Sequence, residues 1–166
     1  MSPRAAWRLE ALGFGEVYDY AASKADWFAC GEPREGVSTE VPWVGDLVRE
    51  DGPTCSPDER VGDVRERVTA SGSDLCVVLD GERMVVGILR GDALSKDVDA
   101  RAEEVMELGP KTVRPSSPVE ELLGRRSSQG VKSWIVTTSH GLLLGLLMRD
   151  DAERALEKSR LRFSRA

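Results

Sequence analysis

The residues able to carry out acid–base or nucleophilic chemistry are few and scattered in this sequence. His140 is the only histidine and lies in the turn TSHGL, and Cys30, Cys55 and Cys76 have no paired spacing. A zinc site needs Cys or His ligands at short, repeated spacings, and an activated nucleophile needs a base beside it. Neither set can be assembled from these residues, and no glycine-rich phosphate loop occurs. The sequence therefore predicts a protein that is not an enzyme.

Polar residues that suit ligand binding occur at matching places in two stretches of the chain. Thr54 stands in PTCSPDERV and Thr112 in KTVRPSSPV, in both cases three residues before a proline. An acidic segment follows an apolar one further along each stretch, in GILRGDA and in GLLMRDD. The same residue types in the same order indicate an internal repeat.

A shift of the sequence by 58 residues makes this repeat explicit. Residues 46–94 then fall on residues 104–152 without a gap. Identical or similar residues meet at many positions, among them Thr54 and Thr112, Pro57 and Pro115, Arg67 and Arg125, Gly72 and Gly130, Gly87 and Gly145, and Asp92 and Asp150. Matches at glycine and proline are unexpected by chance in a gapless overlay, so we expect two copies of one structural unit.

Each copy has the pattern of a strand–helix–strand–strand–helix unit. A short extended piece ends in the T-x-x-P turn, and a helix follows with an apolar face: Val61, Val64 and Val68 in the first copy, Val119, Leu122 and Leu123 in the second. Gly72 or Gly130 is expected to end that helix. Two apolar strands follow, LCVVL and MVVGIL joined through DGER, then WIVTT and LLLGLLM joined through SHG. A last helix is expected to begin at GDAL and at RDDAERALEK.

This order resembles the cystathionine-β-synthase-type (CBS) domain, and two copies in tandem resemble the CBS pair, or Bateman module. The resemblance covers roughly residues 44–157 and implies an α/β (α+β) fold of two βαββα repeats related by a pseudo-two-fold axis. The expected boundaries are residues 44–100 for the first repeat and 101–157 for the second, with a basic tail at 158–166. The resemblance also implies a homodimer.

The resemblance implies a regulatory module that binds an adenosyl ligand (AMP, ADP, ATP or S-adenosylmethionine) between the repeats. In this family a motif aspartate binds ribose hydroxyls, a Thr or Ser lies near phosphate, and backbone around the first short strand contacts the ligand. Carried over by position, the candidate site residues are Thr54, Cys55, Arg90, Asp92, Thr112, Val113, Arg114, Met148, Arg149 and Asp151.

The chain departs from the family motif at several of these positions. Met148 stands where a Thr or Ser is expected, so a hydroxyl is lost, although Arg149 or Arg114 could bind the phosphate instead. In the first copy Arg90 takes the Thr position and Ala93 the Asp position, which leaves Asp92 one residue early and turned by about 100° on a helix.

These departures leave a second reading open, a structural or dimerisation module whose clefts bind nothing. Aspartates at helix starts serve as caps whether or not a ligand is bound, and the two threonines could hydrogen-bond their own turns.

Residues 1–37 resemble the C-terminal part of a rhodanese domain, with a helix, a strand VYDY and a Trp-containing helix, and residues 38–43 are expected to form a linker. The active-site loop of that family precedes this part, so sulfur transfer is not expected. Seven of the nine aromatic residues lie in the first 43 positions. The segment is expected either to wrap its own CBS pair or remain disordered, or to pack on a dimer partner.

Composition limits the remaining possibilities. The chain has 166 residues, 40% of them hydrophobic, and a net charge of −6, without the basic stretch that nucleic-acid binding requires except in the short tail. The longest apolar run, GLLLGLLM, is too short to span a membrane. An odd number of cysteines argues against a disulfide framework, so a reducing cytoplasm is expected.

Overall fold

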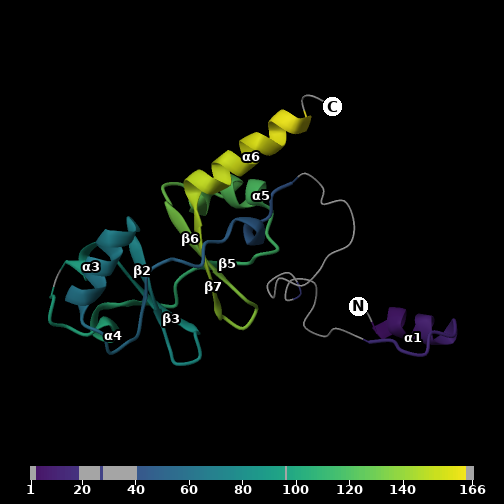
Figure 1. The fold of residues 1–166 in the computed structure, drawn as a ribbon, viewed down its shortest axis with the longest axis horizontal. Helices are drawn as coiled ribbons and strands as arrows, with labels where there is room; N and C mark the ends of the chain where they lie inside the picture. The colour runs from purple at the N-terminus through teal and green to yellow at the C-terminus, as the bar shows by residue number, and fades with distance from the viewer. Residues whose placement is uncertain (1–2, 19–26, 28–40, 96, 164–166) are drawn as a thin grey trace.

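The computed structural model describes residues 3–18, 27, 41–95 and 97–163. The first element is the predicted amphipathic helix, α1 (Pro3–Ala11), which lies apart from the other elements (Figure 1). The strand predicted at VYDY is not formed at Val17 and Tyr18, where the chain is irregular and Tyr18 is exposed. The rest of the rhodanese-like segment, apart from Trp27, lies outside the described residues, as do residues 38–40 of the expected linker and 164–166 of the basic tail.

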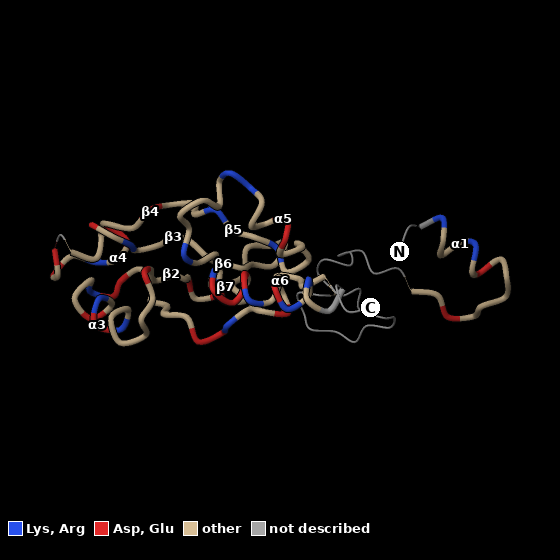
Figure 2. Tube along the Cα trace, turned by 90° about the horizontal axis from the view of Figure 1, so that it is seen from above, with Lys and Arg blue, Asp and Glu red and all other residues tan. Residues whose placement is uncertain are grey.

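The remaining elements form two halves that lie next to each other (Figures 1 and 2). The first half contains a parallel–antiparallel sheet in the order β1-β2-β3-β4 and its helices. Its elements are β1 (Thr54–Cys55), α3 (Val61–Ser71), β2 (Leu75–Leu79), β3 (Val85–Arg90), the 3-10 helix η2 (Gly91–Leu94), α4 (Ala102–Val105) and β4 (Glu107–Leu108).

The second half contains a sheet in the order β5-β6-β7. Its elements are η1 (Val44–Leu47), β5 (Thr112–Val113), α5 (Val119–Gly124), η3 (Arg126–Ser128), β6 (Ser133–Thr137), β7 (Leu143–Met148) and α6 (Arg149–Phe163). Among the described residues no helix is both long and apolar enough to cross a membrane.

The 58-residue offset found in the sequence holds strand by strand. The pairs β1 and β5, β2 and β6, and β3 and β7 have bounds that differ by this offset. Their registers agree too, because Cys76 opposite Leu89 corresponds to Trp134 opposite Leu147, and the irregularity after Val78 corresponds to that after Val136. The predicted repeat of strand, helix and two strands is therefore confirmed.

The two β-hairpins meet on the pseudo-two-fold axis. Met84 pairs with Leu142, its own counterpart in the other repeat. On either side Val85 N–H donates to Gly141 O and Leu143 N–H donates to Arg83 O, both at 3.1 Å. A two-fold axis through the Met84–Leu142 pair relates these two hydrogen bonds to each other, and their equal lengths agree with it.

The halves also exchange a segment each. Residues 42–50 precede the first repeat strand but lie on the second half, where Val44 N–H donates to Ser117 O and Arg49 pairs with Leu146. Residues 100–108 precede the first strand of the second repeat but lie on the first half. There Val61 N–H donates to Ala100 O, and Glu107 pairs with Ile88. Each folded half therefore includes the segment that precedes the first strand of the other repeat.

Three apolar clusters form the core of the part of the chain that the structure describes. Two lie between a sheet and its helices: Val64, Val68, Cys76, Val78 and Leu89 belong to the first, and Val44, Val119, Leu122, Trp134 and Leu147 to the second. The third lies between the two sheets and contains Leu75, Val77, Ile88, Ile135, Leu143 and Leu146. The hairpin strands β2, β3, β6 and β7 therefore contribute to clusters on both faces, which explains their continuous apolar runs.

Two expected helix features differ from the structure. Gly72 ends α3 in the left-handed conformation as predicted, but α5 ends at Gly124, well before Gly130. The backbone turns extended at Arg125, and Arg149 fixes the loop that follows by donating to Val131 O and Ser128 O. In the first repeat the last helix is only the 3-10 turn η2, because the following chain runs across the start of α3 and its Val98 O accepts from Gly62 N–H.

Gly87 and Gly145 allow the exchanged segments to reach the sheet edges. A Cβ at Gly145 would overlap the carbonyl oxygen of Arg49, and one at Gly87 would lie 3.1 Å from Glu107 O and closer still to the Met106 side chain. Glycine at these two positions therefore lets an extended segment approach the sheet edge closely.

Candidate functional site

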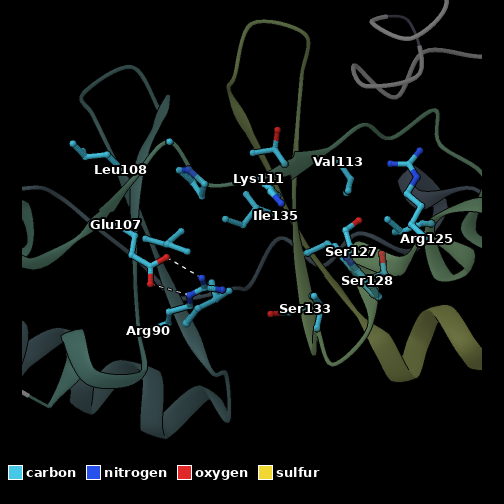
Figure 3. A pocket seen from close by; sticks show the side chains of 18 residues that line it. Arg90, Glu107, Leu108, Lys111, Val113, Arg125, Ser127, Ser128, Ser133 and Ile135 are labelled. Carbon is cyan, nitrogen blue, oxygen red and sulfur yellow. Dashed lines mark hydrogen bonds and ion pairs between the residues drawn. The ribbon is translucent and has the colours of Figure 1, made fainter.

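A cleft of about 640 Å³ lies between the two repeats. One wall comes from β3 and β4, the other from α5, η3 and β6, and residues 109–112 join them (Figure 3). We call this the inter-repeat cleft; it is lined by Leu75, Ile88, Arg90, Glu107, Leu108, Gly109, Pro110, Lys111, Thr112, Val113, Leu122, Arg125, Ser127, Ser128, Val131, Ser133, Trp134 and Ile135. A ligand in it would contact both repeats.

The charged residues of the inter-repeat cleft are mostly cationic. Arg90 forms two hydrogen bonds with the carboxylate of Glu107, at 3.1 and 2.9 Å, and this contact raises the pKa of Arg90. Lys111 is exposed, and Arg125 on the opposite wall forms an ion pair with the exposed Glu121, at 2.8 Å. The three cations outnumber the single lining carboxylate, so the cleft favours an anion.

Hydroxyl groups and apolar side chains complete the lining. Ser127 and Ser128 lie beside Arg125 in Figure 3, and Ser133 lies lower on the same wall. Thr112 accepts a hydrogen bond from the Thr137 hydroxyl at 3.0 Å. The apolar part includes Leu75, Ile88, Val113, Val131, Ile135 and the indole of Trp134. Such a mixture of apolar surface and a few polar groups is typical of small-molecule sites.

Arg149 stabilises the wall of the inter-repeat cleft that contains Ser128 and Val131. Its Nε donates to Val131 O at 2.6 Å and its Nη2 donates to Ser128 O. The guanidinium also stacks on Trp134, 5.1 Å from the ring centroid. Arg149 therefore positions the loop that lines the cleft, although its side chain is not part of the lining.

Three of the sequence-predicted site residues meet in the inter-repeat cleft. Thr112 and Val113 enter it from β5, and Arg90 enters it from the end of β3 in the other repeat. The structure thus brings together residues that the sequence assigned to different copies.

Two predicted residues of the second repeat lie elsewhere. Arg114 donates from Nη1 to the hydroxyl of Thr137 at 2.9 Å and to two carbonyl groups at the end of β6, so it fastens the β6–β7 hairpin. Met148 ends β7 opposite Ser133.

The predicted aspartates do not face the inter-repeat cleft. The carboxylate of Asp151 is bound by Arg49 Nη2 at 2.6 Å and by Arg154, and its side chain is 18% exposed. Asp92 lies in η2, on a neighbouring acidic cleft whose lining carboxylates are Asp74, Asp92, Glu104 and Glu107. Because that cleft is acidic, phosphate is disfavoured there.

Thr54 and Cys55, predicted from the first repeat, are in β1. The carbonyl oxygen of Thr54 accepts from Arg67. Cys55 is 5% exposed and belongs to the core beneath α3 with Cys76. A hydrogen bond between the two thiols, together with burial, raises the pKa of Cys76. Cys76 is fully buried and packs as a small apolar core residue.

Sequence reasoning missed Lys111, Arg125 and Trp134 as site residues. Arg125 carried a usable signal, because it aligns with Arg67 in the repeat. Trp134 gave none, because a tryptophan in an apolar strand is typical of a core. Among the described residues no group of three or more His, Cys, Asp and Glu side chains is placed to hold a metal ion.

No family model matches the sequence, and no curated protein matches it. Solved structures do resemble it. The CBS-pair protein CBSX2 from Arabidopsis thaliana, in complex with AMP, is 21% identical, has a TM-score of 0.62 and is matched over 71% of this chain and 98% of its own. A CBS domain pair in complex with 5′-methylthioadenosine and S-adenosylmethionine is 16% identical, with a TM-score of 0.60 and the same coverage.

The chain has the fold of a CBS domain pair.

The cytosolic domain of the Mg²⁺ channel MgtE, in complex with ATP, shares this fold at 21% identity and a TM-score of 0.61, over 69% of this chain and 48% of that one. The chain thus spans about half the length of that structure and of a structure of the soluble part of a magnesium transporter. The similar structures cover the CBS pair and give no support to a rhodanese-like segment, which stays a prediction.

Proposed function

We propose that this CBS pair is a regulatory module that binds an adenosyl ligand in the inter-repeat cleft. The observation that carries the proposal is that the inter-repeat cleft combines cations, hydroxyls and apolar walls contributed by both repeats. Structures of the same fold contain AMP, ATP, or 5′-methylthioadenosine and S-adenosylmethionine. No catalytic step is part of the proposal.

The residues of the cleft suit the parts of such a ligand. Ile88, Val113 and Ile135 offer apolar surface for a purine ring. Serine hydroxyls and the Glu107 carboxylate offer partners for ribose hydroxyls. Lys111 and Arg125 offer charge for phosphate.

Ligand binding would act on the arrangement of the two repeats. The two walls belong to different halves, so a ligand that fits one spacing of these walls favours that arrangement over others. A partner that contacts both halves, or a second copy in the homodimer that the resemblance implies, would sense the change. The partner, the homodimer and the cytoplasmic location belong to the proposal.

A binding panel tests the proposal. The full chain is titrated by calorimetry with AMP, ADP, ATP, S-adenosylmethionine and NAD, and its Tm is measured with each. At a ligand concentration about a hundred times Kd, binding adds about 2.7 kcal/mol to the free energy of unfolding, which is readily seen as a rise in Tm. Lys111→Gln should weaken the binding of phosphate-bearing ligands, and Lys132→Gln, an exposed lysine outside the lining, should not. Absence of binding by the whole panel would overturn the proposal.

A structural module without a ligand is the second candidate. It is favoured by Asp151, the expected ribose partner, which is engaged by two arginines instead. It predicts that none of the five compounds changes Tm.

A further inference from the structure

Arg67 and Arg125 are counterparts in the two repeats but have different partners. Both stand 13 positions after the threonine that begins the first strand of their repeat, Thr54 or Thr112. Two equivalent cations would be expected in two equivalent clefts. In the structure the two guanidinium groups have different hydrogen-bond partners.

Arg67 is held inside the first repeat. Its Nη1 donates to Thr54 O, and its Nη2 donates to Glu59 Oε2 at 2.7 Å. Glu59 is fixed in turn, because its other oxygen accepts from Ser56 N–H at 2.8 Å. Burial raises the pKa of Glu59, but the bonds from Arg67 and Ser56 outweigh it and hold this pKa below its ordinary value. The guanidinium of Arg67 therefore covers the first strand of its repeat.

Arg125 is not held in this way. The counterpart of Glu59 is Ser117, which carries no charge. Arg125 bonds instead to Glu121 on the surface of α5, where the side chains are 45% and 61% exposed. Such exposed pairs contribute little, so Arg125 can exchange Glu121 for a stronger anion. It lines the inter-repeat cleft beside Ser127 (Figure 3).

A second difference concerns the chain just before each first strand. A Cβ added at Gly52 would lie 2.7 Å from Cδ1 of Leu146, so the backbone there is already packed against that side chain. The counterparts are Pro110 and Ile88, which both line the inter-repeat cleft. The second repeat thus accommodates a proline ring where the first has no room for one carbon.

From these differences we infer that each chain binds one phosphate-bearing nucleotide, held through its phosphate by Arg125, while Glu59 keeps the equivalent position closed by retaining Arg67. This inference rests on the proposed function and adds its ligand class, its stoichiometry and the residue that sets both. A guanidinium binds phosphate oxygens in bidentate fashion. A ligand whose charge is a sulfonium cation would instead meet an excess of positive charge.

Matched substitutions at the two counterparts test the inference. Calorimetric titration of the full chain with ATP should give one site per chain. Arg125→Gln should weaken ATP binding by about tenfold or more, the usual size of a lost charge-assisted hydrogen bond. Arg67→Gln should leave it unchanged, and so should Arg126→Gln, which removes the neighbouring exposed cation outside the lining. Ser117→Glu, which places a carboxylate at the counterpart of Glu59, should weaken it to a similar extent. Thermal unfolding of each variant without ATP checks that the fold is intact.

The outcomes separate this inference from the proposed function. Two ATP sites per chain, equal loss in Arg67→Gln and Arg125→Gln, or unchanged binding in Arg125→Gln and Ser117→Glu would each overturn the inference alone. Binding of S-adenosylmethionine without binding of ATP would overturn the phosphate assignment and leave the proposed function standing. Binding of nothing in the panel would overturn both.

Discussion

Arg49 and Leu146 exchange two backbone hydrogen bonds, of 2.8 and 2.9 Å, although they are far apart in the sequence and belong to different repeats. The pair attaches chain from before the first strand to the edge of the second sheet. Ile88 and Glu107 are its counterpart on the other half. Because each half receives a segment from outside its own run of strands, the two halves are expected to unfold together.

Val44 tests this dependence. It belongs to the exchanged segment and is fully buried in the core of the second half, against residues such as Trp134 and Leu147. Val44→Ala should lower the free energy of unfolding by roughly 2 kcal/mol, because a buried apolar side chain is shortened. Urea unfolding measures it, with the exposed Val98→Ala as the control. Equal stability of the two variants would show that the segment is not part of the folded core.

Gly145 should tolerate no side chain. Its φ is +147°, and a Cβ would overlap the carbonyl oxygen of Arg49. Gly145→Ala should therefore lower the free energy of unfolding by roughly 3 kcal/mol through strain and displacement of the edge segment. Gly81, which has no neighbour within 4 Å of such a Cβ, is the matched control. A stable Gly145→Ala protein would contradict the close approach.

The bond between Glu59 and Arg67 predicts a pH dependence. Because the pKa of Glu59 is lowered in the folded state, its contribution to stability is present above the ordinary pKa of 4.5 and is lost as the pH falls through the lowered pKa. Glu59→Gln should thus be less stable than the wild type at pH 7, by no more than about 1 kcal/mol since the pair is partly exposed. The difference should shrink as the pH falls below 4.5. Unfolding curves across this range measure it, with the exposed Glu66→Gln as a control. A stability difference between the wild type and Glu59→Gln that increases as the pH falls would contradict a stabilising bond between Glu59 and Arg67.

Substitution of Asp151 distinguishes a structural role of its carboxylate from a role in ligand binding. Its carboxylate joins Arg49 of the exchanged segment to the start of α6. Asp151→Ala should therefore reduce stability, by about 1 kcal/mol, and leave the affinity for ATP unchanged. The family motif predicts the opposite, loss of ligand with little effect on folding. Calorimetry and urea unfolding of this one variant decide between them.

Local sequence patterns were sufficient for the repeat, the strands and the first helix of each copy. Val61, Val64 and Val68 are buried as their spacing predicted, and the offset between strands holds residue by residue. These features depend on neighbours a few positions apart, or on the repeat itself, so the sequence displays them.

Features decided by distant residues were not predictable in this way. Asp151 fits the family position, yet its partner Arg49 lies in the other repeat's leading segment. Arg149 fixes the loop after α5 through Val131 O and Ser128 O, and Arg67 is bound by Glu59, whose counterpart Ser117 carries no charge. The sequence contains these residues but not the contacts that give them their roles.

The most direct test is a crystal structure of the full chain grown with ATP. The nucleotide should lie between β3–β4 and β5–β6, with its purine near Ile88 and Ile135 and its phosphates near Lys111 and Arg125. Density over Thr54 and Arg67, or an inter-repeat cleft left without nucleotide at saturating ATP, would contradict the assignment of the ligand site.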